Sequence, residues 1–196
     1  MKFYHGSTIH GLTELHPHLP AGAHLQEPRV YLTTSRQLVL HYIWDSQRLG
    51  DVKMPMLDVR KDGTIVFQEM FSGALAYLYK GVSGYIYHCE GDYSGDSVPY
   101  APFNVTVSST VPISECEYID DVYEHILQYE KQGKFIYEHY EDLPQWRIDL
   151  IRGQILRRIK VYNLLEDSAH SSRDFVSKNF PRYWEEAKVL HEHDLL

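Results

Sequence analysis

A change in hydrophobic periodicity near residue 118 limits the possible folds more than any other feature of this chain. Before it, short runs of β-branched and aromatic residues alternate with turn residues, a pattern that predicts strands. After it, apolar residues recur at helical spacing. Strands followed by helices are typical of the α+β class. We therefore predict a core over residues 1–118 and a C-terminal helical region, packed on that core, over residues 119–196.

The first predicted strand is Lys2–Ser7, which places Phe3 and His5 on one face because side chains alternate along a strand. Gly6 follows His5, so the backbone can approach a ligand closely at this point. A titratable side chain at the end of a strand is a common place for binding chemistry. His5 is therefore the first candidate for a functional residue.

Further strands and short helices are expected in the rest of the predicted core. Residues 29–34 read as a strand, after which Ser35 caps a predicted helix that continues to Ile43. Helical spacing over residues 67–79 predicts another helix, which Gly73 weakens. Other strand-like runs are expected at 55–58, 64–67, 85–89, 104–108 and 111–118.

The C-terminal region predicts four helices, at residues 120–133, 142–160, 171–178 and 181–191. Pro144 fits the first turn of the longest one. Its expected apolar face consists of Trp146, Leu150, Ile151, Ile155, Leu156 and Ile159.

Composition excludes several classes of function. A formal net charge of −8 argues against binding to nucleic-acid backbones, which favours a basic surface. Two cysteines are too few for a disulfide scaffold. The sequence has no run of 18 apolar residues and no N-terminal apolar segment, so we expect a cytoplasmic protein without a membrane partner.

Four histidines lie in one polar loop over residues 7–27, and their spacing does not favour a metal site. His16 and His18 would point to opposite sides of an extended segment, and no cysteine or paired carboxylate lies in register with them. We therefore expect no metal. The other two loop histidines are His10 and His24.

Three segments, taken together, resemble the ADP-ribosyltransferase fold. They are Tyr4-His5-Gly6-Ser7, then Arg29 to Ser35 leading into a helix, and then Tyr85-Ile86-Tyr87 with Glu90. Their order and spacing are most similar to the small rifampin-type enzymes, which share a core with the poly(ADP-ribose) polymerases. The resemblance covers residues 2–118 and implies a split β-sheet with a cleft that binds NAD as co-substrate.

The resemblance also implies roles for individual residues. His5 would bond to a ribose hydroxyl of the adenosine half, the Gly6 backbone would pair with the nicotinamide amide, and Tyr31 would stack on the nicotinamide ring. Further contacts with NAD are implied for Ser7, Thr33 and Tyr42.

Transfer from NAD passes through an oxocarbenium-like state, so an acidic residue is needed close to the ribose. The strand-like run 105–109 contains none. Asp96 is the preferred candidate by position, with Asp92, Glu115 and Glu117 as alternatives.

Two functions remain open from the sequence. The first is an NAD-dependent ADP-ribosyltransferase, with His5, Tyr31 and Asp96 as catalytic residues and an unidentified acceptor. The second is a catalytically inactive module of the same fold that binds NAD or ADP-ribose. A related RNA 2′-phosphotransferase activity is disfavoured by the acidic balance and the lack of a basic groove.

Overall fold

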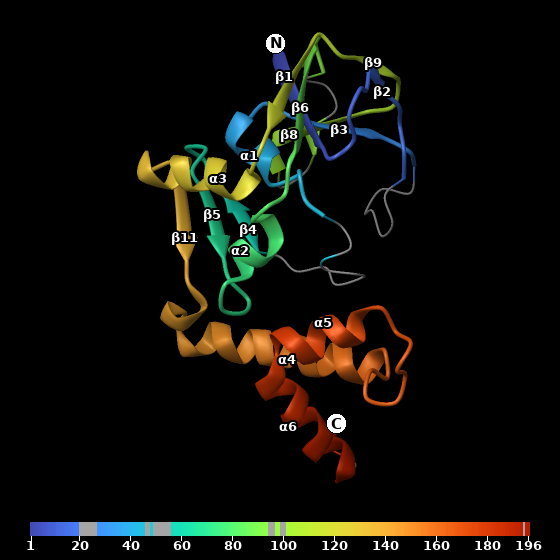
Figure 1. The fold of residues 1–196 in the computed structure, drawn as a ribbon, viewed down its shortest axis with the longest axis vertical. Helices are drawn as coiled ribbons and strands as arrows, with labels where there is room; N and C mark the ends of the chain where they lie inside the picture. Colours follow the sequence, from blue (N-terminus) through green and yellow to red (C-terminus); the bar gives the residue numbers. More distant parts are fainter. Residues whose placement is uncertain (20–26, 46–47, 49–55, 94–96, 99–100, 194) are drawn as a thin grey trace. The chain divides into compact units, whose positions relative to one another are not determined.

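A computed structural model describes most of the chain (Figure 1). The described residues are 1–19, 27–45, 48, 56–93, 97–98, 101–193 and 195–196. Antiparallel strands and helices both contribute, so the predicted α+β class is confirmed. In the part of the chain that is described, no helix is both long and apolar enough to cross a membrane.

The chain forms two units. The first consists of Met1–Asp45, Leu57–Val66 and Tyr79–Ile136, and the second of Ser46–Met56, Phe67–Leu78 and Tyr137–Leu196. This division differs from the expected boundary at residue 118. Helix α3 (Val122–Lys131) belongs to the first unit because it packs against α1 (Arg36–Leu40). Phe71 belongs to the second because its ring lies 5.4 Å from that of Phe180.

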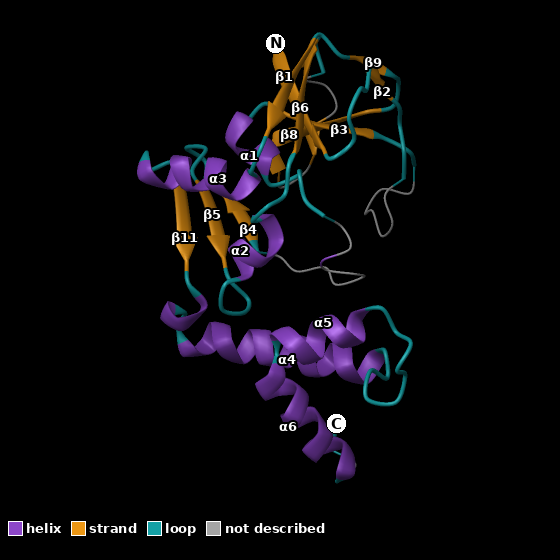
Figure 2. Ribbon diagram, in the orientation of Figure 1, coloured by secondary structure: helices purple, strands orange, loops and turns teal. Residues whose placement is uncertain are grey.

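A six-stranded antiparallel sheet organises the first unit (Figure 2). Its strands, in spatial order, are β10 (Glu115–Ile119), β6 (Gly84–Glu90), β1 (Lys2–Ser7), β3 (Val30–Thr33), β8 (Ala101–Val107) and β7 (Ser97–Val98). The predicted first strand is thus confirmed, and the structure places it in the centre of the sheet. One face of this sheet buries the side chains of Phe3, Leu15, Val30, Leu32, Cys89, Val105, Val107 and Val111.

The sheet opens between its two central strands. Strand β1 pairs with β6 along its whole length, from Lys2 opposite Glu90 to Ser7 opposite Tyr85. With β3 it shares a single pair, Tyr4 opposite Thr33. Beyond that pair, no further register pair joins β1 and β3 within the described residues.

Caps and glycines set the helix ends in the first unit. Ser35 is the N-cap of α1, as predicted, and its Oγ accepts a hydrogen bond from the Leu38 N–H at 3.2 Å. Helix α1 ends at Leu40, earlier than expected, and its side chains at Leu38, Val39 and Leu40 are buried. Asp121 caps α3 in the same way, and Gly133 follows its end with a φ of +70°.

A three-stranded sheet with the order β11-β5-β4 corrects two predictions. It consists of β4 (Leu57–Val59), β5 (Ile65–Gln68) and β11 (Phe135–Glu138). The helix expected over residues 67–79 is wrong in its first half. The buried residues Ile65–Phe67 belong to β5, the central strand of this sheet. Only Ala74–Tyr79 is helical (α2), starting after Gly73, whose φ is +75°. Strand β11 lies where only helices were expected.

Helices dominate the second unit. Besides most of α2, they are the short 3-10 helix η3 (Tyr140–Asp142), α4 (Gln145–Val161), α5 (Ser172–Asn179) and α6 (Pro181–Glu192). The last three were predicted from their spacing. Helix α4 packs on α6, where Arg152 Nε donates to the Glu186 carboxylate at 2.9 Å. Its buried stripe is narrower than predicted, because Trp146 and Leu150 are exposed.

Candidate functional site

A cavity of about 440 Å³ lies in the first unit, at the end of β1 where the sheet opens. Its volume is in the range of small-molecule sites. Four of the residues predicted to contact NAD line it: His5, Gly6, Ser7 and Tyr42. The opposite wall comes from the following loop and includes Glu14, His16 and His18.

A buried tyrosine holds that loop in place. The hydroxyl of Tyr87 donates to the Ile9 carbonyl at 2.7 Å and accepts from the Leu12 N–H at 3.3 Å. Further on, the short strand β2 (Glu14–Leu15) pairs with β9 (Val111–Pro112). Leu15 is buried in the core and Glu14 is exposed, and both residues line the cavity.

The ring of His5 bridges the opening in the sheet. Its Nδ1 lies 2.9 Å from the Tyr31 carbonyl oxygen. A carbonyl can only accept, so Nδ1 carries the proton and Nε2 of the neutral ring is an acceptor. Burial lowers the pKa of His5 more than the hydrogen bond to Tyr31 raises it, and the nearby His18 also lowers it, which favours the neutral ring.

Gly6 has a structural reason to lack a side chain. A Cβ at this position would lie 2.6 Å from the Val39 carbonyl oxygen and 2.9 Å from Cγ1 of Ile43. Packing of α1 on β1 therefore requires the glycine, whatever binds in the cavity. Next to it, Ser7 Oγ accepts from the Ile9 N–H at 3.1 Å, and among the described residues the serine proton has no acceptor.

Tyr42, which lines the cavity, forms a polar pair with Asn104, which does not line it. The Asn104 amide donates to the Tyr42 hydroxyl at 2.8 Å, so the phenol proton of Tyr42 is available to a ligand. Burial of this hydroxyl raises the pKa of Tyr42. The Asn104 Oδ1 is buried without a hydrogen-bond partner in the described part of the chain. Such an unmet acceptor is costly and makes Asn104 a candidate site residue.

Two other predicted residues do not line the cavity. Tyr31 is half-buried and contributes its backbone carbonyl to His5, while its ring lies 6.4 Å from that of the cavity residue His18. Thr33 is fully buried. Its hydroxyl donates to the Phe103 carbonyl at 2.9 Å and accepts from the Ser35 N–H. That hydroxyl serves the fold, not a ligand.

The predicted acids are not gathered at this cavity. Asp96 lies outside the described residues, and Asp92 is exposed and does not line the cavity. Glu115 and Glu117 are on β10 and flank the buried His88, with Glu115 Oε2 3.1 Å from its Nδ1.

Both glutamates of β10 are also paired with cations, Glu115 with Lys2 and Glu117 with Arg36. Among the described lining residues, Glu14 is the one carboxylate. Its Oε1 lies 3.2 Å from His16 Nε2 in an exposed pair, which contributes little to stability.

His10, His16 and His18 each contact a different neighbour, and His24 lies outside the described residues. His16 Nδ1 lies 3.3 Å from the Thr110 hydroxyl, and His10 packs on Tyr85 with ring centroids 4.9 Å apart. In the described segments, no cluster of three or more His, Cys, Asp or Glu side chains is arranged to hold a metal ion.

Sequence reasoning missed Glu14 and Asn104. A signal existed for Glu14, because it precedes a leucine that alternation would bury. For Asn104, the signal was a polar residue at the start of a β-branched run. Its partner Tyr42 is 62 residues away, and the sequence does not indicate that pairing.

Comparison with protein-family models, with curated proteins and with solved structures finds no match to this chain.

Proposed function

We propose that the cavity beside His5 binds NAD and that the protein transfers ADP-ribose from it to an acceptor. The observation that carries this proposal is the opening between β1 and β3, with the His5 ring bonded across it to the Tyr31 carbonyl. The ordered motifs that resemble ADP-ribosyltransferases lie on these two strands and on β6.

The polar groups at the cavity suit a dinucleotide. With Nδ1 held by Tyr31, the Nε2 of His5 accepts a hydrogen bond from a ribose hydroxyl. Ser7 and Tyr42 each have a hydroxyl proton to donate, which fits phosphate or amide oxygens.

In the reaction, the bond between ribose C1′ and the nicotinamide nitrogen breaks, and nicotinamide leaves with the electron pair of that bond. The acceptor then bonds to C1′ and gives up its proton. Positive charge builds up on the ribose in between, and a nearby carboxylate stabilises it. Glu14 is the carboxylate that the described cavity offers for this role.

Binding of NAD without transfer is the second candidate. It is favoured by Glu115 and Glu117, which are engaged with His88, Lys2 and Arg36 and do not line the cavity. In this case the same polar groups hold NAD, and no nicotinamide is released.

Titration calorimetry with NAD, together with chromatographic detection of nicotinamide, separates the two candidates. Transfer predicts release of nicotinamide, even with water as acceptor, and a loss of at least about tenfold in His5→Ala and in Glu14→Gln. The control variant His125→Ala removes a half-buried histidine that pairs with Asp120 and does not line the cavity, and it should change neither binding nor release.

NAD binding without release would support the second candidate, provided that His5→Ala weakens binding. Failure of the wild-type protein to bind NAD would overturn both. Binding and release that are unchanged in His5→Ala would also reject the proposed site.

A further inference from the structure

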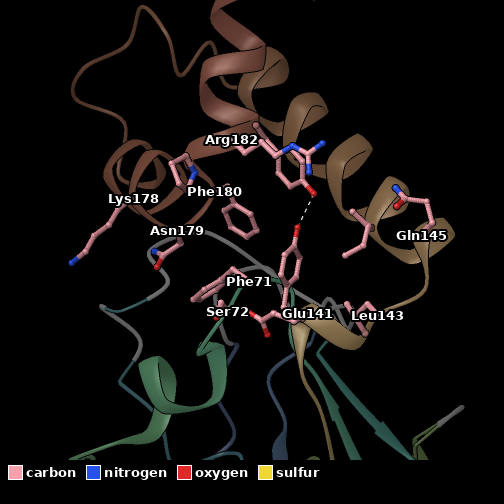
Figure 3. A pocket seen from close by; sticks show the side chains of 13 residues that line it. Phe71, Ser72, Glu141, Leu143, Gln145, Lys178, Asn179, Phe180 and Arg182 are labelled. Atoms are coloured by element: carbon pink, nitrogen blue, oxygen red, sulfur yellow. Dashed lines mark hydrogen bonds between the residues drawn. The ribbon is translucent and has the colours of Figure 1, made fainter.

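The second unit contains a larger cavity, of about 660 Å³, which the proposed function does not use (Figure 3). Its lining comes from Phe71 and Ser72, from the segment around η3 and the start of α4, and from the junction of α5 and α6. The volume lies well within the range of small-molecule sites. All of these residues belong to the same unit.

Buried aromatic rings form part of its wall. Phe71 and Phe180 pack edge to face with centroids 5.4 Å apart, and Tyr183 is stacked on Phe180 at 6.4 Å with an interplanar angle of 23°. All three side chains are almost fully buried, so packing fixes their positions before any ligand enters. This wall of the cavity is therefore apolar and preformed, and each ring exposes a small part of its surface there.

Two tyrosine hydroxyls provide a polar group at this wall. The hydroxyl oxygens of Tyr140 and Tyr183 lie 2.9 Å apart, as the dashed line in Figure 3 marks. The pair has two protons and uses one in its mutual bond. Within the described residues the second proton has no acceptor, so it is available to a ligand oxygen. Burial raises the pKa of Tyr183, so its phenol remains protonated at neutral pH.

A cation, Arg182, also lines this cavity. The positive charge of Arg182 acts on the Tyr183 phenol, and among the described residues Arg182 has no carboxylate partner. Glu186, the acidic neighbour of Tyr183, is bound by Arg152. Figure 3 shows Arg182 at one end of the group of side chains and Glu141 at the other, with Phe180 and Phe71 between them.

We propose that this cavity binds a small aromatic anion, a planar ring system that bears a carboxylate or a phosphate. The ring lies against Phe71 and Phe180. The anionic group accepts the free tyrosine proton and faces Arg182. Glu141 also lines the cavity, sets its negative end and fixes the orientation of the ligand by repulsion.

Two probes of the same shape and different charge test this proposal, 1-naphthoate and the neutral 1-naphthamide. Titration calorimetry on the full chain should give tighter binding of the naphthoate. Arg182→Gln should weaken naphthoate by about fivefold, the size of one exposed charge interaction, and leave naphthamide unchanged. Glu141→Gln should strengthen naphthoate by about twofold, because a like charge is removed.

Arg157→Gln is the matched control, since it removes the same charge from an exposed position on α4 that does not line the cavity. It should leave both affinities unchanged. A third probe, 1-naphthyl phosphate, separates the two anion types, because the natural ligand class is the one whose probe binds more tightly.

Equal affinity for naphthoate and naphthamide would overturn the proposal. So would an equal loss of naphthoate binding in Arg182→Gln and Arg157→Gln, or no binding of any probe at millimolar concentration. Because NAD binding is not involved, these outcomes are independent of the proposed function.

Discussion

Replacing Gly6 by alanine tests whether the first unit needs this glycine for packing or for ligand approach. An added Cβ would lie 2.6 Å from the Val39 carbonyl oxygen, about 0.8 Å closer than the 3.4 Å at which ordinary contact begins. It would also lie 2.9 Å from Ile43 Cγ1. The nearest atom belongs to the backbone of α1, so a change of rotamer cannot relieve the clash.

Insertion of a methyl group into such a contact costs about 1–3 kcal/mol, and we expect about 2–3 kcal/mol because the backbone must move. A loss of 2–3 kcal/mol raises the equilibrium constant for unfolding of the first unit roughly 30- to 160-fold. Gly153→Ala is the control. It lies within α4, nothing lies within 4 Å of its added Cβ, and alanine is the better helix former there by about 1 kcal/mol.

Hydrogen exchange followed by mass spectrometry of peptides reads the two units separately. In Gly6→Ala, amide exchange should accelerate roughly 30- to 160-fold in β1 and β6 and stay unchanged in α4. In Gly153→Ala, it should slow by about fivefold in α4 alone.

Unchanged exchange in β1 of Gly6→Ala would refute the packing argument. If NAD binding were lost in that variant at full stability, the glycine would serve ligand approach, as the resemblance to ADP-ribosyltransferases implies. A loss of stability of the expected size would show that the glycine is needed for the contact with α1.

Two further variants probe buried polar groups. Glu69→Ala should destabilise the second unit by about 2–4 kcal/mol, measured by the same exchange method, because the Tyr137 hydroxyl and the Tyr140 N–H lose their acceptor. An effect no larger than that of the exposed Glu185→Ala would contradict this. Burial lowers the pKa of His41 to about 3, so the unfolded chain binds its proton first as the pH falls below about 6.5. The free energy of unfolding should therefore be about 2–3 kcal/mol lower at pH 4.5 than above pH 6.5. Urea unfolding of His41→Phe should lack this part of the loss. An equal loss in both proteins would refute the prediction.

Local signals in the sequence predicted most of the elements. Ser35 as a cap, Pro144 before a helix and the alternation in Lys2–Ser7 each act within a few residues, and the structure contains the elements that they predict. Strand β11 was missed because its sequence, Phe135–Glu138, is strand-like for only four residues and follows a helix. It becomes a strand through β5, which lies far away in the chain.

The site was less predictable, because its contacts join distant segments. His5, Gly6, Ser7 and Tyr42 were expected to contact NAD, and all four line one cavity. Thr33 looked equivalent in sequence, but its hydroxyl is used by the Phe103 carbonyl, 70 residues away.

Ile43 links the stability of the first unit to the shape of the candidate site. Its side chain is fully buried and fills the space that Gly6 and Gly84 leave by lacking a Cβ, where an added atom on Gly84 would lie 2.4 Å from Ile43 Cγ2. Gly84 and Ser7 are also in close contact, since the same added atom would lie 2.7 Å from the Ser7 carbonyl oxygen. Tyr42 directly precedes Ile43 in the chain, and its side chain lines the cavity. The packing of Ile43 at the end of β1 therefore also fixes the backbone position of Tyr42. A change that loosens Ile43 must therefore alter both the stability of the sheet and the position of the Tyr42 hydroxyl.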